Sequence, residues 1–150
     1  MKNIATILIA FFIIGCGGGG DGVPINFAKE QLTKQDYYSA YAQYGTNDCI
    51  DEFIKYSFKD TTYTKTIYKD SSFSKVKETI SDKIEYLTPL NIALYEKGDI
   101  FDCTVAIESE NNVTLVCLNR AIADKSYSIF RSLFATKEDA LKNKKEECSK

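Results

Sequence analysis

The stretch that decides the fold is IFDCTVAIESENNVTLVCL, residues 100–118. Its two ends are rich in β-branched and apolar residues and its centre, Glu108–Asn112, is polar, which is the pattern of two strands joined by a turn. If the chain turns about Glu110, Cys103 and Cys117 are equidistant from the turn and lie opposite each other. The sequence therefore predicts an antiparallel hairpin at the centre of a sheet, with a Cys103–Cys117 disulfide across it.

Three more segments along the chain have the composition of strands: Thr61–Lys69, Leu90–Tyr95 and Tyr127–Phe134. The first alternates threonine with larger side chains, as an exposed or edge strand does. The second follows Pro89, which disfavours a continuing helix. With the hairpin, these segments predict a β-meander.

Four other segments have the apolar spacing or the start signals of helices. They are residues 33–44, 46–58 and 71–84, and a last helix that Thr136 and Asp139 would cap. The element order predicts a small single α+β domain, in which about four helices pack on a mainly antiparallel sheet that two disulfides hold together.

The amino terminus carries an export pattern. Lys2 is followed by an unbroken apolar run, Ile4–Ile14, and then by Gly15 and Cys16. The run is too short for a permanent membrane span and has the length of a signal peptide's hydrophobic region. Two other interpretations stay open, namely an ordinary secretory signal with a coincidental cysteine and an uncleaved anchor helix.

The segment Ile13-Ile14-Gly15-Cys16 resembles the lipobox of bacterial lipoproteins. The resemblance implies that residues 1–15 are removed and that Cys16 carries two or three acyl chains (palmitate is typical), which anchor the protein to a membrane. It also implies a bacterial cell envelope location, on the periplasmic or the surface face. Because Gly17 and not aspartate follows Cys16, the outer membrane is favoured.

These signals divide the chain into three parts: a signal peptide at 1–15, the lipidated cysteine with a glycine-rich tether at 16–32, and a single domain at 33–150. Cleavage would leave 135 residues, enough for one domain. Without Lys2, 18 basic residues face 21 acidic ones, a net charge of −3. This balance lacks the clustered excess of basic residues that nucleic-acid binding requires.

Besides Cys16, two cysteines remain after the hairpin pair is assigned. In an exported chain an even number of cysteines indicates disulfides, so elimination pairs Cys49 with Cys148. The alternative is that the domain cysteines are free and buried in a reducing compartment.

The chain contains no histidine. This excludes serine–histidine and cysteine–histidine catalysis and histidine-bound zinc, and we expect no metal and no cofactor. An enzyme would have to use paired carboxylates, as glycoside hydrolases do. The candidates are Asp48, Asp51, Glu52, Asp99 and Asp102. The alternative interpretation is that these acids simply favour helix starts.

Tyrosine is abundant between Tyr37 and Tyr63. On the expected helix, Tyr37, Tyr41 and Tyr44 share a face, which would suit stacking on a sugar or a peptide. The alternative is that this face packs on the sheet.

The turn of the hairpin contains Glu110-Asn111-Asn112-Val113-Thr114. The segment has the general pattern for N-glycosylation at Asn112, and it resembles the longer acidic sequon of some bacterial glycosylation systems.

These observations predict a lipid-anchored envelope protein with a non-catalytic binding or scaffolding domain. Its partners would be the membrane, through the acyl chains on Cys16, and an envelope protein or cell-wall component. The alternative function is a cell-wall glycan hydrolase that uses paired carboxylates.

Overall fold

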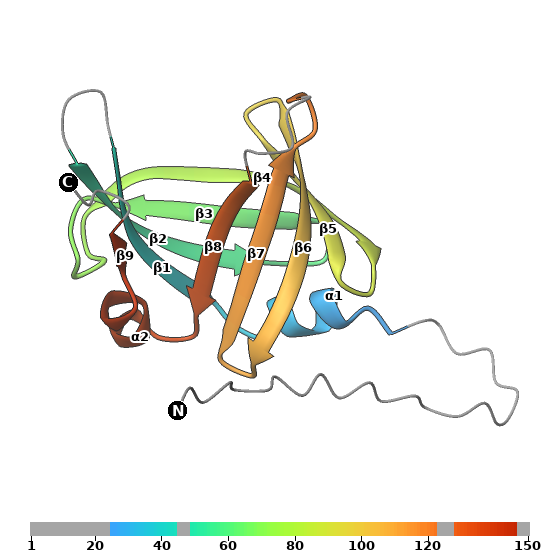
Figure 1. Ribbon diagram of the computed structural model, residues 1–150, viewed down its shortest axis with the longest axis horizontal. Coiled ribbons are helices and arrows are strands. Elements are labelled where there is room, and N and C mark those ends of the chain that lie inside the picture. Colours follow the sequence, from blue (N-terminus) through green and yellow to red (C-terminus); the bar gives the residue numbers. More distant parts are fainter. Residues whose placement is uncertain (1–24, 45–48, 123–127, 147–150) are drawn as a thin grey trace, which may run out of the picture.

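The computed structural model describes residues 25–44, 49–122 and 128–146 of the chain. Eight strands form a closed antiparallel barrel, and two short helices lie outside it (Figure 1). The strands of the barrel are β1 (Tyr37–Tyr44), β2 (Cys49–Phe58), β3 (Thr62–Tyr68), β4 (Val76–Thr88), β5 (Asn91–Glu96), β6 (Asp99–Ser109), β7 (Asn112–Asn119) and β8 (Ser128–Phe134). The helices are α1 (Phe27–Leu32) and α2 (Lys137–Lys142), and a short strand, β9 (Lys145–Glu146), follows α2.

Each strand from β2 to β8 pairs with its neighbour in sequence, and β1 closes the barrel. It pairs with β2 along its whole length and with β8 at Tyr38 and Phe134. Beyond that point β9 runs parallel to β1, with Tyr41 opposite Lys145. Closure leaves no free edge along most of the sheet, which is how such barrels avoid edge-to-edge association.

Alternate residues of each strand point into the barrel, where they form the main core. An eight-stranded barrel has an interior just wide enough for side chains to fill it or for one small ligand. Here most of the interior is filled by aliphatic and aromatic side chains. The completely buried members include Tyr37, Ile54, Ile92, Val105, Val113 and Leu133.

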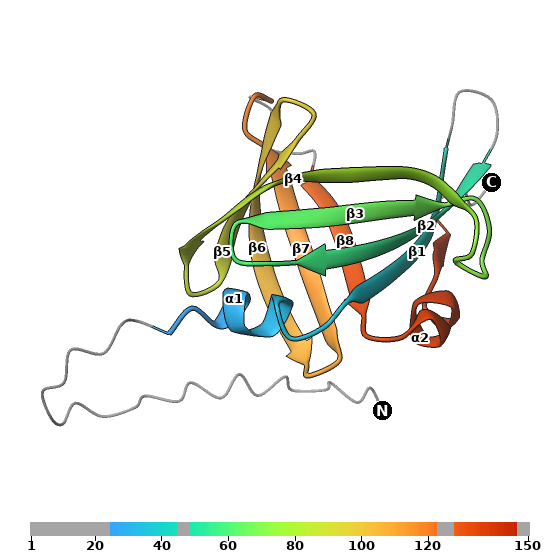
Figure 2. The same cartoon turned by 180° about the vertical axis from the view of Figure 1, so that it is seen from behind.

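Helix α1 closes one end of the barrel (Figure 2). The side chain of Asn26 caps it by accepting a hydrogen bond from the Lys29 amide at 2.9 Å. The amide of Ala28 donates to the carbonyl of Pro89 in the β4–β5 turn, and the side chain of Gln31 donates to the carbonyl of Glu110 in the β6–β7 turn. The helix lies within residues 16–32, the segment that the sequence analysis gave to the tether.

A second, smaller core lies outside the barrel wall. Phe73, in the β3–β4 connection, contacts the rings of Tyr38, Phe53 and Tyr68 edge-on, at centroid distances of 5.4–5.8 Å. Ala140 of α2 is completely buried in the same cluster. The outer faces of β1 and β2 are therefore covered as well as their inner faces.

The prediction of an α+β domain with about four helices is wrong. Residues 33–44, 46–58 and 71–84, expected to be helical, contain β1, β2 and the first two thirds of β4. In β1 and β2 both faces are covered, so apolar residues do not alternate with polar ones and the period of two is hidden. In β4 the inward residues Ile80 and Ile84 are four apart, a spacing that fits a strand and a helix equally well.

The expected strands and the last helix were predicted correctly, whereas α1 and β9 were not expected. The expected strands correspond to β3, β5, β6, β7 and β8, and α2 starts at Thr136, whose hydroxyl accepts from the Asp139 amide at 3.1 Å. The hairpin is confirmed in its register, since Cys103 lies opposite Cys117 and the two are joined by a disulfide.

The other expected disulfide cannot be placed in the same way. Cys148 lies outside the described residues, as does Cys16. Cys49 is the first residue of β2, but the position of its side chain is not described. The Cys49–Cys148 pairing stays a prediction.

Candidate functional site

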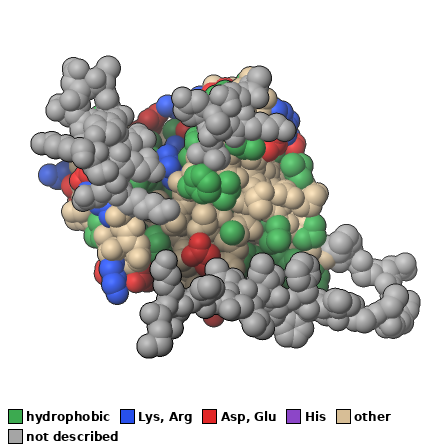
Figure 3. Space-filling model, viewed as in Figure 1, with side chains coloured by type: hydrophobic (Ala, Val, Ile, Leu, Met, Phe, Trp, Pro, Cys, Tyr) green, Lys and Arg blue, Asp and Glu red, His purple; other side chains and the backbone are tan. Residues whose placement is uncertain are grey.

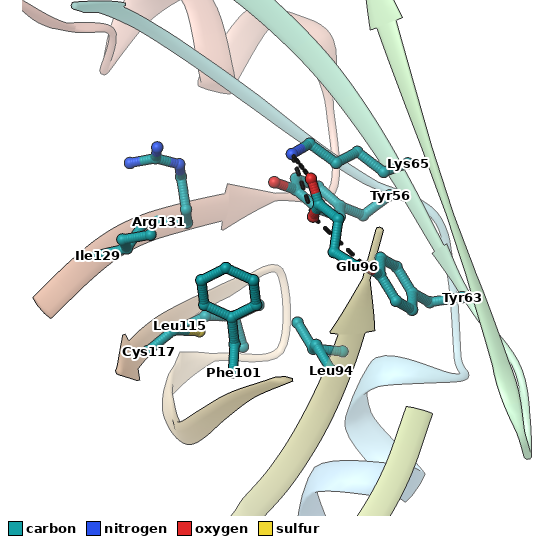
Figure 4. A pocket seen from close by; sticks show the side chains of 10 residues that line it. All are labelled: Tyr56, Tyr63, Lys65, Leu94, Glu96, Phe101, Leu115, Cys117, Ile129 and Arg131. Carbon is teal, nitrogen blue, oxygen red and sulfur yellow. Dashed lines mark hydrogen bonds and ion pairs between the residues drawn. The ribbon is translucent and has the colours of Figure 1, made fainter. Parts of the chain in front are cut away.

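A cavity of about 110 Å³ lies inside the barrel, toward the end opposite α1 (Figure 4). We call this end the mouth. The inner wall of the cavity is apolar and consists of Leu94, Phe101, Leu115 and Ile129. Cys117 also lines it, so the hairpin disulfide forms part of the wall.

The cavity ends where aromatic rings fill the half of the barrel nearer α1. The ring of Phe58 stacks on Tyr56 at 5.9 Å and on Tyr63 at 6.3 Å, and meets Tyr37 edge-on at 6.4 Å. Tyr37 is anchored to α1, because its hydroxyl donates to the carbonyl of Gln31 at 2.9 Å. Only the mouth half of the interior is therefore open to a ligand.

An ion pair lines one side of the cavity. The Lys65 ammonium lies 3.0 Å from the Glu96 carboxylate, and the two side chains are 15% and 27% exposed. The hydroxyl of Tyr63 holds the end of β5 by donating to the carbonyl of Tyr95 at 2.9 Å. Burial lowers the pKa of Lys65, but its electrostatic interactions with Tyr56 and Glu96 together have the larger effect. The pKa of Lys65 is therefore raised above its usual value. Lys65 thus carries its positive charge near neutral pH.

Arg131 lines the other side, from β8. Its guanidinium stacks over the ring of Tyr41 at 4.0 Å, and Nη1 donates to the carbonyl of Phe130 at 2.9 Å. The hydroxyl of Tyr41 donates to Glu52. Among the described residues, no carboxylate lies within 4.0 Å of Arg131. Figure 4 shows Arg131 and the Lys65–Glu96 pair on opposite sides of the cavity.

Three tyrosines near the mouth stay protonated. Burial is the main cause that raises the pKa values of Tyr41, Tyr56 and Tyr63 above the usual value of 10.0. Neutral phenols donate hydrogen bonds but do not act as bases at neutral pH. The cavity thus offers a neutral apolar wall, neutral hydroxyls, one ion pair and the Arg131 cation.

The candidate carboxylates are not brought together. Asp51 points outward from β2 and pairs with Lys144 at 2.7 Å, whereas its neighbour Glu52 is bonded to Tyr41. On β6, Asp102 pairs with Arg120 at 2.5 Å, which lowers the pKa of Asp102, and Asp99 is exposed at the start of the strand. Asp48 lies outside the described residues.

The expected tyrosine face is placed differently. Tyr37 and Tyr41 lie on β1, not on a helix, and both point into the barrel, where they are 0% and 6% exposed. They form no exposed stacking platform, although Tyr41 contributes to the mouth through its contact with Arg131. Tyr44 is the last residue of β1, and its side chain is not among those described.

Asn112 lies at the start of β7 and is partly buried. Its Nδ2 atom, which a glycan would modify, donates to Glu108 at 2.7 Å, and its Oδ1 atom is buried without a hydrogen-bond partner. A glycosylating enzyme would have to pull this side chain away from Glu108. Glycosylation stays a prediction.

The sequence analysis missed the residues that give the cavity its character, namely Tyr56, Lys65, Glu96 and Arg131. A signal for two of them was present. Lys65 lies two residues from Tyr63 and from Ile67, and Arg131 lies two residues from Ile129 and from Leu133. In a strand these positions share one face, so a charged residue between two apolar ones predicts a charge inside the barrel.

Within residues 25–44, 49–122 and 128–146, no three histidine, cysteine, aspartate or glutamate side chains meet in a group that could hold a metal ion. In the same residues no helix has the length and apolar character of a membrane span. The chain matches no family model, and no curated protein or solved structure was found to be similar to it.

Proposed function

We propose that this chain is a lipid-anchored protein of the bacterial envelope and that its barrel is a non-catalytic binding domain. The anchor rests on the lipobox-like segment that ends at Cys16. The binding role rests on one observation, the cavity at the mouth, which joins an apolar wall to the Arg131 cation.

The size of the cavity limits the ligand. A dry cavity of about 150 Å³ lined by apolar side chains accepts benzene, whereas the space here is about 110 Å³. Drug-sized pockets are larger, at about 300–1,000 Å³. The cavity therefore takes an apolar group of about four or five carbons, and any larger part of a ligand stays outside the mouth.

The charges at the mouth indicate the polar end of the ligand. Lys65 is already neutralised by Glu96 at 3.0 Å. Arg131 has no such partner among the described residues, and its planar guanidinium suits a carboxylate or a phosphate. We infer a small amphipathic anion, with its apolar end against Leu115 and Ile129 and its charged end on Arg131.

The alternative, a glycan hydrolase, receives less support. Such an enzyme needs two carboxylates about 5–9 Å apart, one on each side of the scissile bond. Of the described residues that line the cavity, Glu96 alone carries a carboxylate, and it is held by Lys65. This arrangement favours binding without catalysis.

A titration of the purified domain with pentanoate and with 1-pentanol, followed by nuclear magnetic resonance, tests the binding role. We expect both ligands to shift the signals of Leu94, Leu115 and Ile129, and pentanoate to bind more tightly because it alone carries a charge. The variant Ile129→Phe fills the opening and should abolish both shifts. The proposal would be overturned if pentanoate did not shift the signals of the cavity residues. It would also be overturned if the shifts were the same in Ile129→Phe as in the wild type.

A further inference from the structure

The closed end of the barrel carries a group of exposed apolar side chains. They are Ile25, Phe27, Leu87, Leu90 and Ile107, with exposed fractions between 41% and 61%. We call this group the α1-end patch. Single exposed apolar residues are ordinary in proteins, but a group of large ones indicates a contact surface.

Hydrogen bonds between their neighbours hold these residues at one end of the molecule. The side chain of Asn26 donates to the carbonyl of Thr88, and the amide of Ala28 donates to the carbonyl of Pro89. These contacts place Ile25 and Phe27 beside the β4–β5 turn, which contains Leu90 and follows Leu87 near the end of β4. Phe27 and Ile107 line one shallow groove.

The charges around the patch do not form a basic surface. Lys29 pairs with Asp60 at 3.3 Å, and Lys34 pairs with Glu110 at 3.5 Å. A surface of this kind suits an apolar partner better than an anionic one, because the basic side chains nearest to it are already paired.

The chain outside the described residues indicates what this partner is. Eight residues, 17–24, lie between Cys16 and Ile25, the first residue of the patch, so nine Cα–Cα steps join the two. Even a fully extended chain spans at most about 3.3–3.6 Å per residue, or roughly 30 Å for this segment. If Cys16 is lipidated, the patch is the part of the domain that is joined most directly to the bilayer.

We propose that the α1-end patch rests on the membrane that holds the acyl chains of Cys16, with Phe27 entering the interface between headgroups and acyl chains. This inference rests on the anchor in the proposed function. The end of β5 and the start of β8, which carry the cavity residues Glu96 and Ile129, lie at the other end of the barrel from α1 (Figure 1), so the binding cavity faces away from the membrane.

The outer wall of the barrel offers a competing apolar surface. Phe130, half exposed on β8, lies opposite Val116 of β7, and Figure 3 shows apolar side chains on this face of the molecule. This wall lacks the direct connection to Cys16 that the α1-end patch has, so a tryptophan at Phe130 serves as a second reporter in the test.

The chain contains no tryptophan, so a single introduced tryptophan reports its own surroundings. The full-length protein is expressed in a bacterial host that lipidates exported proteins and is reconstituted in phosphatidylcholine vesicles with brominated acyl chains. The variants are Phe27→Trp in the patch, Phe130→Trp on the wall and Ile122→Trp at the mouth end. Bromine quenches tryptophan only when the two are close.

We expect the emission of Phe27→Trp to shift to the blue and to lose most of its intensity in brominated vesicles, whereas that of Ile122→Trp does not change. Since the contact is apolar, the quenching should persist at high salt. A quenched Phe130→Trp with an unquenched Phe27→Trp would overturn the inference in favour of the barrel wall. A blue-shifted but unquenched Phe27→Trp would overturn it in favour of a second copy or another protein.

A label of radioactive fatty acid on the same preparation separates this inference from the anchor. If the protein carries the label and Phe27→Trp stays unquenched, the anchor stands and the docking surface is wrong. If the protein carries no label, the anchor is wrong and the docking surface is wrong with it.

Discussion

Lys65 and Arg131 are charged residues at inward positions of their strands, with apolar side chains two residues before and after each of them. The surroundings decide their different roles. Lys65 is held by Glu96 at 3.0 Å and contributes to the structure of the mouth. Arg131 is stacked on Tyr41 and has no carboxylate within 4.0 Å in the described part of the chain. The same feature of the sequence thus gives a paired charge on β3 and, on β8, the charge that we propose binds the ligand.

In the proposed function, Cys16 holds the domain at a membrane. We expect Cys16→Ser to lose the fatty-acid label and to leave the membrane fraction, because the hydroxyl of serine does not replace the thiol that is acylated. Labelling and fractionation of the wild type and the variant measure this directly. Asn112→Gln serves as a control that leaves the anchor intact. A Cys16→Ser variant that still carries the label would show that the lipobox interpretation is wrong.

At the scale of elements, Phe73 joins the β3–β4 connection to the outer face of the barrel. It is 5% exposed and contacts three aromatic rings. We expect Phe73→Ala to lower the free energy of unfolding by about 3–5 kcal/mol, the usual cost of such a truncation in a core. Urea denaturation of this variant and of Phe130→Ala measures the difference.

Phe130 is the matched control, because it is 50% exposed on the outer wall. Its truncation should change the free energy of unfolding by about 0.5 kcal/mol or less. Equal effects of the two substitutions would mean that the outer aromatic cluster does not stabilise the fold.

The expected second disulfide, Cys49–Cys148, would join β2 to the C-terminal end of the domain. With Cys103 joined to Cys117, the cysteines left in the domain are Cys49 and Cys148. We expect peptide mapping without reduction to give two crosslinked peptides, Cys103–Cys117 and Cys49–Cys148, and no free thiol in the domain. A Cys49–Cys103 or Cys49–Cys117 peptide would contradict the register of β6 and β7.

The central hairpin could be predicted from sequence because its information is local. The two cysteines are symmetric about Glu110, and the strand composition on each side agrees with that symmetry. The strands β1 and β2 could not be predicted from sequence, because their outer faces are covered by α2 and by Phe73. This covering is a tertiary contact between distant segments, and it makes both faces of a strand apolar. The apolar residues of such a strand then fit the period of a helix as well as they fit the period of two that a strand has.

The closed barrel as a whole depends on one more long-range contact, the pairing of β1 with β8. The two strands are about ninety residues apart, and Tyr38 and Phe134 form the pair. Nothing in the local sequence of either strand specifies this pairing. The cavity follows from closure, which is why Lys65 and Arg131 could each be found as an inward charge but the cavity could not be found as one site.

The whole molecule should be sensitive to alkaline pH. Burial raises the pKa values of Tyr56 and Tyr63 above 10.0, so the unfolded chain releases these protons at lower pH than the folded one does. Above pH 10 the unfolded state binds fewer protons, and the free energy of unfolding falls by about 1.4 kcal/mol per pH unit for each group. Lys65, whose pKa is also raised, acts in the same direction.

Circular dichroism and tyrosinate absorbance, recorded together as the pH rises, measure this effect. We expect the loss of β-structure and the ionisation of these tyrosines to occur in one transition above pH 10, and Tyr56→Phe to weaken the pH dependence. Tyrosines that ionise fully while the barrel stays folded would contradict their burial.

The most direct test of the binding role compares the two arginines of the chain. Arg131 lines the cavity, whereas Arg120 lies on the surface and pairs with Asp102. Calorimetry with pentanoate should show that Arg131→Gln binds at least about tenfold more weakly than the wild type, since a hydrogen bond to a charged group contributes about 1.5–3 kcal/mol. Arg120→Gln should bind like the wild type. If Arg131→Gln keeps full affinity, or if both variants lose it equally, the mouth of the barrel is not the anion-binding site.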